Sequence, residues 1–268
     1  MMRFQLFRHR WLISLAVALG ARSAKPDYVE APVEMIPESE RQTIVVFGAS
    51  GRIGGVVVEE ALGRGHRVIG ISRSPEKFTI NHASFSAAKG DVTSVESFRE
   101  VTAGANAVII LVQESYEGKT PETTVQAIAA STAVAALTGI EDAPYVLHFG
   151  GATSMYETKE AMLENLEAPA PEGSENHAKF FGHLVALQTF RASDIDWTVL
   201  TPPFSIRGWS SRGVTDMTRT GSYRTSTTEL ITNEDGDHAD ILIVDLAVAA
   251  VDEIENRQFI RRRFTAAN

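Results

Sequence analysis

The stretch that decides the fold is T-I-V-V-F-G-A-S-G-R-I-G, residues 43–54. Residues 44–47 are β-branched and aromatic, which predicts a buried strand. Glycines follow at Gly48, Gly51 and Gly54, and residues 56–62 are compatible with a helix. A strand, a tight glycine turn and a helix N-terminus in this order are typical of a site that holds the diphosphate of a dinucleotide.

Each glycine of this turn has an expected physical role. Gly48 allows the sharp turn, Gly51 lets the backbone approach the phosphates, and Gly54 lets the helix pack closely on the strand. The free amides and the positive end of the helix then face the anion. A glycine-rich loop without a ligand is the alternative. The predicted cofactor-binding residues of the turn are Gly48, Ala49, Ser50, Gly51, Arg52, Ile53 and Gly54.

A second strand is expected at residues 66–72, which completes a βαβ unit of about thirty residues. The end of this strand reaches the adenosine ribose, where an acidic residue would favour NAD. Here Arg73 follows the strand instead, and its planar guanidinium suits a 2′-phosphate. Arg52 points to the same region, and Lys77 adds charge. The sequence therefore predicts NADP(H) in preference to NAD(H), the alternative being that Arg73 is a solvated surface residue.

The next motif is G-D-V-T at residues 90–93, after a weak strand candidate at residues 83–87. The turn after the third strand of a doubly wound sheet lies beside the adenine. Asp91 is a candidate acceptor for the adenine amino group, and Val92 lies next to it. Asp91 is equally a candidate N-cap for a helix at residues 94–101.

Strands and helices continue to alternate along the chain. Further strands are predicted at residues 107–112, 145–149 and 195–200, and further helices at residues 123–138 and 176–192. This alternation predicts an α/β fold with a doubly wound, Rossmann-like parallel sheet. We expect one domain over residues 43–268, with a small C-terminal region on the substrate side. The polar residues 156–173 read as an excursion from it.

The loops that follow the strands should converge on one site, because ligands bind beyond the carboxyl ends of such sheets. Candidates beside the nicotinamide are Val112, Gln113 and Gly150. Candidates for contact with a substrate are Tyr116, Pro202 and Phe204, with Trp209 as a further aromatic residue that could stack.

Two residues are candidates for catalysis. His183 lies on the predicted helix 176–192 and can titrate near neutrality. Ser154 follows the fifth strand, at the usual place of a substrate-orienting hydroxyl. The alternatives are a helix histidine satisfied by a backbone carbonyl and a loop serine that caps a turn. We expect His148, inside a strand, to belong to the core.

The composition and the N-terminal residues limit the classes of function that the chain can have. A net charge of −9 argues against nucleic acid as a general partner, and the absence of cysteine excludes disulfides and thiolate metal sites. No pattern of a metal centre is found. Residues 1–10 are basic, residues 11–21 are apolar and small residues follow, which resembles a signal peptide. The apolar stretch is short for a stable membrane span.

Residues 1–42 are therefore interpreted as a signal-peptide-like segment and a linker. Such a segment indicates export or an organelle, whereas use of NADPH indicates the cytoplasm. Translation from Met35 would remove the conflict. A monomer and a homodimer are both compatible with the sequence.

The whole pattern resembles the atypical short-chain dehydrogenase/reductases, in particular candidate NADH-flavin reductases and the flavin reductase/biliverdin reductase B type. The resemblance spans residues 43–265 and implies NAD(P)H binding and, in some members, reduction of flavin- or quinone-like acceptors. It rests on the blocks G-A-S-G-R-I-G (48–54), A-L-G-R-G-H-R-V (61–68), S-R-S-P-E-K (72–77), G-D-V-T (90–93), F-G-G-A (149–152), D-W-T-V-L-T-P-P (196–203), R-T-G-S-Y-R (219–224), D-L-A-V-A-A-V-D-E-I-E-N (245–256) and R-R-F-T (262–265).

The chain departs from the wider superfamily at its catalytic pair. Many members carry Tyr-x-x-x-Lys on the helix before the sixth strand, but residues 176–192 contain no tyrosine. His183 falls near the tyrosine position, where flavin reductase-like relatives also carry histidine, and Leu187 falls near the lysine position. Two functions are therefore expected from the sequence. They are an NADPH-dependent reductase of a planar flavin- or quinone-like acceptor and a non-catalytic NADP(H) sensor. A sugar-nucleotide epimerase or dehydratase fits less well.

Overall fold

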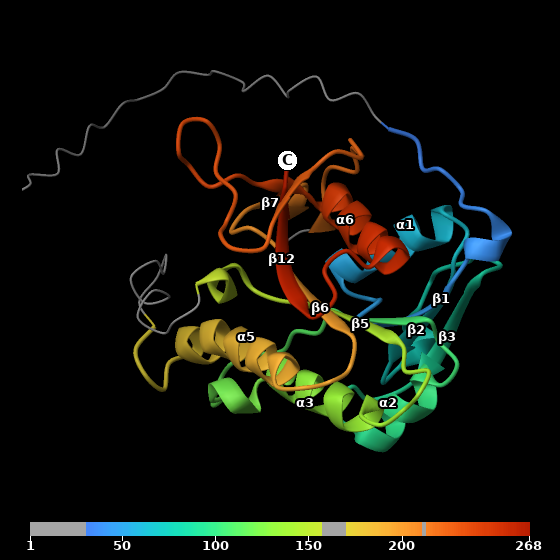
Figure 1. Cartoon of the computed structure of the whole chain (residues 1–268), viewed down its shortest axis with the longest axis horizontal. Coiled ribbons are helices and arrows are strands. Elements are labelled where there is room, and N and C mark those ends of the chain that lie inside the picture. The colour runs from blue at the N-terminus through green and yellow to red at the C-terminus, as the bar shows by residue number, and fades with distance from the viewer. Residues whose placement is uncertain (1–30, 157–169, 211–212) are drawn as a thin grey trace, which may run out of the picture.

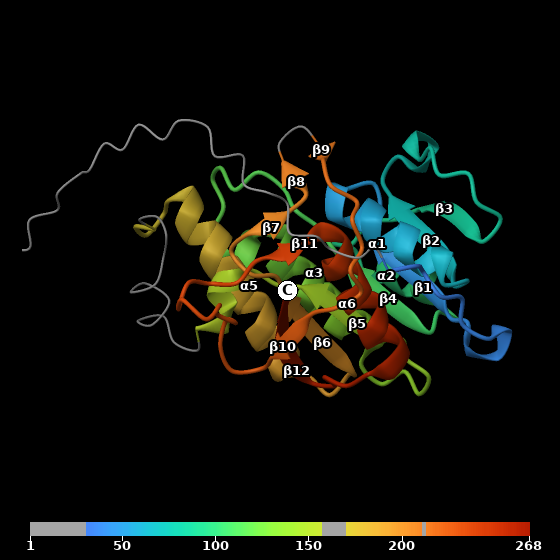
Figure 2. The ribbon, with the colours of Figure 1, turned by 90° about the horizontal axis from the view of Figure 1, so that it is seen from above.

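The computed structural model describes residues 31–156, 170–210 and 213–268 of the chain. A sheet in the order β10-β12-β6-β5-β4-β1-β2-β3 forms its centre (Figures 1 and 2). All neighbours in this sheet are parallel except β10, which is antiparallel to β12. Its strands are β1 (Thr43–Phe47), β2 (Arg67–Ser72), β3 (Phe85–Lys89), β4 (Ala107–Ile110), β5 (Tyr145–Phe149), β6 (Trp197–Thr201), β10 (Arg224–Ser226) and β12 (Arg262–Ala267).

Helices cover both faces of the sheet. Figure 1 shows α1 and α6 on one face and α2, α3 and α5 on the other. The helices are α1 (Arg52–Gly63), α2 (Val95–Thr102), α3 (Val125–Leu137), α5 (Glu175–Arg191) and α6 (Ile243–Asn256). The short elements are η1 (Glu38–Glu40), η2 (Pro75–Lys77), η3 (Pro121–Thr123), η4 (Ala152–Met155), β7 (Ile206–Arg207), β8 (Trp209–Ser210), β9 (Gly213–Val214) and β11 (Ile241–Leu242).

Strand β1 shows how the core is divided between the two layers. Its side chains alternate, so Ile44 and Val46 pack with α1 and α6, whereas Val45 and Phe47 pack with α2, α3 and α5. The strand is apolar throughout because both faces are covered. It pairs with β2 on one side and β4 on the other, so the strand order reverses direction here. This switch point is where open α/β sheets place a ligand crevice.

The sequence predicted this α/β fold and its doubly wound parallel sheet, and both are confirmed. The predicted strands are present with shifted ends: the strand expected at residues 83–87 is β3, and the one expected at 107–112 is shorter. Two strands of the sheet, β10 and β12, were not predicted. The expected excursion at residues 156–173 lies mostly outside the described residues.

The described part of the N-terminal segment lies against α1. The Ala31 amide donates to the Arg219 carbonyl at 2.7 Å, and the Ile36 amide donates to the Arg64 carbonyl at 3.0 Å. Val33 packs beside Gly63. Residues 1–30, which carry the signal-peptide-like pattern, lie outside the described residues. Among the helices that are described, none has the length and apolar character needed to cross a membrane.

Candidate functional site

Backbone neighbours fix two glycines of the turn between β1 and α1. Gly48 has φ +87°, and a Cβ there would lie 2.0 Å from the Leu111 carbonyl oxygen. A Cβ on Gly54 would lie 2.1 Å from the Gly48 carbonyl oxygen. Gly51 is less confined, because its Cβ would lie 3.1 Å from that same oxygen. The fold therefore explains Gly48 and Gly54, whereas a Cβ on Gly51 would require a shift of only a few tenths of an ångström.

The N-terminus of α1 differs from those of α2, α3 and α5 in its cap, and from that of α6, which also lacks a side-chain cap but carries Asp245 in its first turn. Ser94 caps α2, Thr124 caps α3 and Ser174 caps α5, each through its side-chain hydroxyl. Helix α1 begins after Gly51, which offers no side-chain cap, and its first turn contains no acidic residue. Residues 50–52 are exposed. The first amides of α1 and the positive end of its dipole are thus open to an anion.

Arginine side chains lie on two sides of this turn. Arg52 is the first residue of α1, and its guanidinium lies 5.4 Å from the centre of the Trp209 ring. Arg73 is exposed immediately after β2. The pKa of Asp91 is lowered, first by the hydrogen bonds from Thr93 and further by the nearby charge of Arg73. Arg73 and Asp91 therefore face the same end of the sheet, beyond β2 and β3.

Asp91 does not cap α2, so that alternative from the sequence is wrong. Its Oδ1 accepts from the Thr93 amide at 2.9 Å and the Thr93 hydroxyl at 2.7 Å. The Ser94 hydroxyl caps the helix by accepting from the Ser97 amide at 3.2 Å. Asp91 is exposed in a tight turn, and Val92 beside it is buried.

The loop after β4 brings polar groups to the same edge of the sheet. Val112 is half-buried, and Gln113 is exposed with its side chain hydrogen-bonded to Tyr116. Tyr116 is only 8% exposed, and its hydroxyl accepts from Gln126 Nε2 at 2.5 Å. Burial raises the pKa of Tyr116. Because the Tyr116 ring is buried, a planar ligand cannot stack on it as it lies. This burial does not support the predicted stacking role.

The turn after β5 is filled by protein. A Cβ on Gly150 would lie 2.8 Å from Thr201 Oγ1, and a Cβ on Gly151 would lie 2.6 Å from His183 Cδ2. Ser154 is fully buried, and its hydroxyl donates to the Gly151 carbonyl at 2.8 Å. This is the turn-capping contact that was the alternative for Ser154. The expectation of a substrate-orienting hydroxyl gains no support from this geometry, because no ligand can reach the buried oxygen as it lies.

The His183 ring of α5 lies against Gly151, so this contact packs α5 against the turn after β5. Burial, with a smaller effect from the charge of Lys179, lowers the pKa of His183 to about 4. Its Nδ1 has no hydrogen-bond partner among the described residues. The carbonyl partner that was the alternative for this histidine is therefore not found at Nδ1. His183 is neutral at pH 7, so it offers a hydrogen bond rather than a charged acid.

His148 belongs to the core, as the sequence predicted. It is 1% exposed, and its ring lies 5.4 Å from the ring of Phe190, centre to centre. Neither ring nitrogen has a partner in the part of the chain that is described. Burial lowers the pKa of His148 to about 3, with a smaller effect from His183. Two neutral imidazoles thus lie near each other under the carboxyl end of β5.

The loop after β6 contributes the remaining predicted residues. Pro202 and Phe204 are half-buried, and the Phe204 ring lies 5.3 Å from the His238 ring. Sequence reasoning missed Arg263 of β12, which is 3% exposed and donates to the Ser154 carbonyl. Its one clue is a charge inside an otherwise apolar strand.

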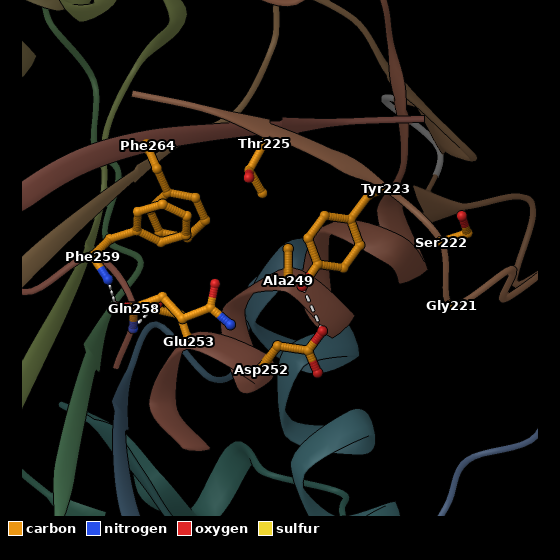
Figure 3. A pocket seen from close by; sticks show the side chains of 10 residues that line it. All are labelled: Gly221, Ser222, Tyr223, Thr225, Ala249, Asp252, Glu253, Gln258, Phe259 and Phe264. Carbon is orange, nitrogen blue, oxygen red and sulfur yellow. Dashed lines mark hydrogen bonds between the residues drawn. The ribbon is translucent and has the colours of Figure 1, made fainter. Parts of the chain in front are cut away.

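The cavities found in the described residues lie away from the glycine turn. One of about 380 Å³ lies between α6 and the strands β10 and β12 (Figure 3). In it Tyr223 donates to Asp252 at 2.5 Å, and Phe259 stacks on Phe264 with centroids 4.2 Å apart. A second, of about 430 Å³, is lined by Ala31, Arg219 and residues of α1. Within the described ranges, no three His, Asp or Glu side chains are grouped to hold a metal ion.

The sequence profile of the NAD(P)H-binding family matches residues 48–241, from the first glycine of the turn to β11. The chain belongs to this family. A solved structure of a candidate exported protein from Burkholderia pseudomallei is 29% identical, with a TM-score of 0.65, and the match covers 85% of this chain and 100% of that one.

Two further relatives are similar over most of their length. The structure of a candidate NADH-flavin reductase from Streptococcus pneumoniae is 25% identical, with a TM-score of 0.64, over 85% of this chain and 99% of that one. The YwnB protein of Bacillus subtilis is 28% identical over 233 residues, which is 84% of this chain and 98% of YwnB. The resemblance to NAD(P)H-binding reductases that the sequence indicated is thereby confirmed at the level of the family.

Proposed function

We propose that this NAD(P)H-binding protein is an NADPH-dependent oxidoreductase that passes a hydride to a flavin- or quinone-like acceptor. The observation that carries the proposal is the uncapped N-terminus of α1 behind the turn Gly48–Gly54. Its uncapped amides suit a diphosphate, and the exposure of residues 50–52, with no side chain on Gly51, lets one approach. The name of the Streptococcus pneumoniae relative supports the class of reaction.

The preference for NADPH is argued from charge. Arg73 is exposed after the end of β2, and Arg52 is the exposed first residue of α1. A guanidinium binds a phosphate through parallel hydrogen bonds, which a ribose hydroxyl cannot match. Asp91 remains the proposed partner of the adenine amino group, since Thr93 occupies its Oδ1 only. Val92 would support the adenine side, and Val112, Gln113 and Gly150 the nicotinamide side.

The acceptor side is argued from His183. The bound nicotinamide supplies the hydride, so the protein needs mainly to hold two planar groups against each other. A neutral His183 beside Gly151 can donate one hydrogen bond to a carbonyl of the acceptor and orient it. Pro202 and Phe204 are the proposed wall of this side, because both are half-buried in the loop after β6.

The alternative function is a non-catalytic NADP(H) sensor, which one observation favours. Helix α5 carries no tyrosine, and its buried histidine, His183, is held neutral by burial. A sensor needs the cofactor site but no group that delivers a proton. Both functions therefore share the turn at Gly48–Gly54 and differ on the acceptor side.

Steady-state oxidation of NADPH and NADH by the purified protein tests these functions, with FMN, FAD and a soluble quinone as acceptors. If the protein is a reductase, we expect it to oxidise NADPH faster than NADH with at least one acceptor. We also expect the His183→Phe variant to oxidise NADPH more slowly than the unaltered protein. Tight NADPH binding without turnover on any acceptor would support the sensor instead. Failure to bind either nucleotide would contradict both.

A further inference from the structure

An exposed tryptophan lies beside the first turn of α1. Strand β8 (Trp209–Ser210) pairs antiparallel with β9 (Gly213–Val214), and Figure 2 shows both near the N-terminal end of α1. Gly208 precedes the pair with φ +75°, and its carbonyl accepts from the Thr215 amide at 2.8 Å. The Trp209 side chain remains 43% exposed. Core packing therefore does not hold this ring in place.

The ring and its neighbour hold the side chain of Arg52. The guanidinium carbon of Arg52 lies 5.4 Å from the centre of the Trp209 ring, within the range of a cation–π contact. Arg52 Nη1 also donates to the Ser210 carbonyl at 2.5 Å. In the described part of the chain this is the one hydrogen bond of the Arg52 side chain, and a guanidinium has five N–H donors. Most of its donors therefore remain available to a ligand.

We propose that Trp209 is a positioning residue of the cofactor site, which holds the Arg52 guanidinium ready for the 2′-phosphate of NADP(H) and so contributes to cofactor selectivity. The inference rests on the proposed function and names a residue that acts through Arg52 rather than by touching the nicotinamide. An unheld arginine would lose its rotamer freedom when the phosphate binds. An arginine already held by a ring and a carbonyl loses less, which strengthens binding.

A purely structural role for this contact fits the geometry less well. If Trp209 served only to stabilise β8 and β9, its ring would be expected to pack against their side chains rather than stand exposed over a charge. If Arg52 served only to anchor this strand pair, its position in the turn Gly48–Gly54 would be a coincidence. The hydrogen bond from Arg52 to Ser210, next to Trp209, joins residues 158 positions apart at the N-terminal end of α1.

A double-mutant cycle on the full chain tests the proposal, with dissociation constants for NADPH and NADH measured by calorimetry. We expect Trp209→Ala to weaken NADPH binding about three- to fivefold, in line with a cation–π contact at an exposed site, and to change NADH binding by less than about twofold. In the Arg52→Ala background, Trp209→Ala should have no further effect. Trp209→Phe, which keeps an aromatic ring, should recover part of the loss.

The matched control is Met217→Ala, which removes another exposed apolar side chain from the segment after β9. It should leave both dissociation constants unchanged. An equal loss for NADPH and NADH, or the same loss with and without Arg52, would overturn the proposal. If the unaltered protein bound neither nucleotide, the proposed function itself would fail. If it bound NADPH tightly and Trp209→Ala bound it equally well, only the role of Trp209 would fail.

Discussion

Two glycine turns follow parallel strands of the same sheet, and they are used in opposite ways. The turn after β1 leads into a helix with uncapped amides, and residues 50–52 are exposed. The turn after β5 is filled by its own neighbours: the Thr201 hydroxyl lies against Gly150 and the His183 ring lies against Gly151. The missing Cβ atoms make room for backbone at Gly48 and Gly54 and for side chains at Gly150 and Gly151, so only the first turn keeps an exposed stretch, residues 50–52, for the proposed cofactor.

This difference divides the carboxyl edge of the sheet into two halves. The half formed by β1, β2 and β3 offers free amides and arginines, as an anionic cofactor requires. The half formed by β5, β6 and α5 offers two neutral histidines, His148 and His183. Cofactor affinity is therefore expected to depend mainly on the first half and only weakly on the second, where Gly150 is the proposed neighbour of the nicotinamide.

The largest effect is expected from Gly48→Ala. The new Cβ would meet the Leu111 carbonyl at 2.0 Å, and φ is +87°, so the backbone must move. We expect a loss of roughly 3–5 kcal/mol in the free energy of unfolding, measured by urea denaturation, and no NADPH binding. Gly104→Ala is the matched control, because Gly104 has φ +74° but no atom within 4 Å of its Cβ position. An equal cost in both variants would contradict a steric origin of the effect.

Arg73→Ser is expected to act on cofactor choice alone. A hydrogen bond to a charged group contributes about 1.5–3 kcal/mol, so NADPH affinity should fall roughly ten- to a hundredfold. NADH affinity should stay within about twofold, since no 2′-phosphate is lost. The control is Arg67→Ser, at the opposite end of β2 and also exposed. A parallel loss for both nucleotides would show that Arg73 does not read the 2′-phosphate.

Gly151→Ala sharpens the comparison from the other side. Its Cβ would lie 2.6 Å from His183 Cδ2, so the imidazole must move and not the backbone. We expect a destabilisation of about 1–2 kcal/mol and no change in NADPH affinity. Nitrogen-15 NMR of the imidazole should show a new environment for His183. A loss of NADPH binding would mean that the two turns do not have separate roles.

The smallest effect concerns His148 and acid stability. Its pKa of about 3 in the folded protein lies below the usual value of about 6.5, so the unfolded chain binds a proton that the folded chain does not. Stability is thus full above about pH 6.5 and is lost as the pH falls toward 3.

His148→Phe should remove this dependence, which is worth roughly 1–2 kcal/mol between pH 7 and pH 5. Phenylalanine also leaves no unpartnered nitrogen beside Phe190. Urea denaturation at both pH values measures the effect, with the exposed His82→Phe as control. An unchanged pH dependence in His148→Phe would show that this imidazole is not held neutral.

The fold was largely predictable because its signals are local. The apolar residues of β1, the glycine spacing after it and the alternation of strands and helices are all visible in short windows of sequence. Strand β12 was missed because Arg262 and Arg263 hide its apolar half, and only the folded sheet shows that Arg263 is buried against the Ser154 carbonyl. Asp91 and Ser94 are both good caps, and the start of the first helical turn decides between them.

The candidate site was predictable only in its cofactor half. The geometry of the glycine turn depends on residues close together in the sequence, so the roles of Gly48 and Gly54 could be assigned from their spacing. Ser154 could not, because its burial depends on Thr201 and β12, which are distant in sequence. The contact between Arg52 and Trp209 likewise exists only once β8 lies beside α1.

The most direct test of the central claim is calorimetric titration with NADPH. It compares the purified full chain with its Gly51→Ala variant. A Cβ on Gly51 would meet the Gly48 carbonyl oxygen at 3.1 Å, and φ is −75°, so the variant should fold after a shift of a few tenths of an ångström. We predict that the unaltered chain binds NADPH more tightly than NADH and that Gly51→Ala binds NADPH at least about tenfold more weakly, because the methyl group stands where the diphosphate approaches. Absence of NADPH binding by the unaltered chain, or equal binding by Gly51→Ala, would contradict the account.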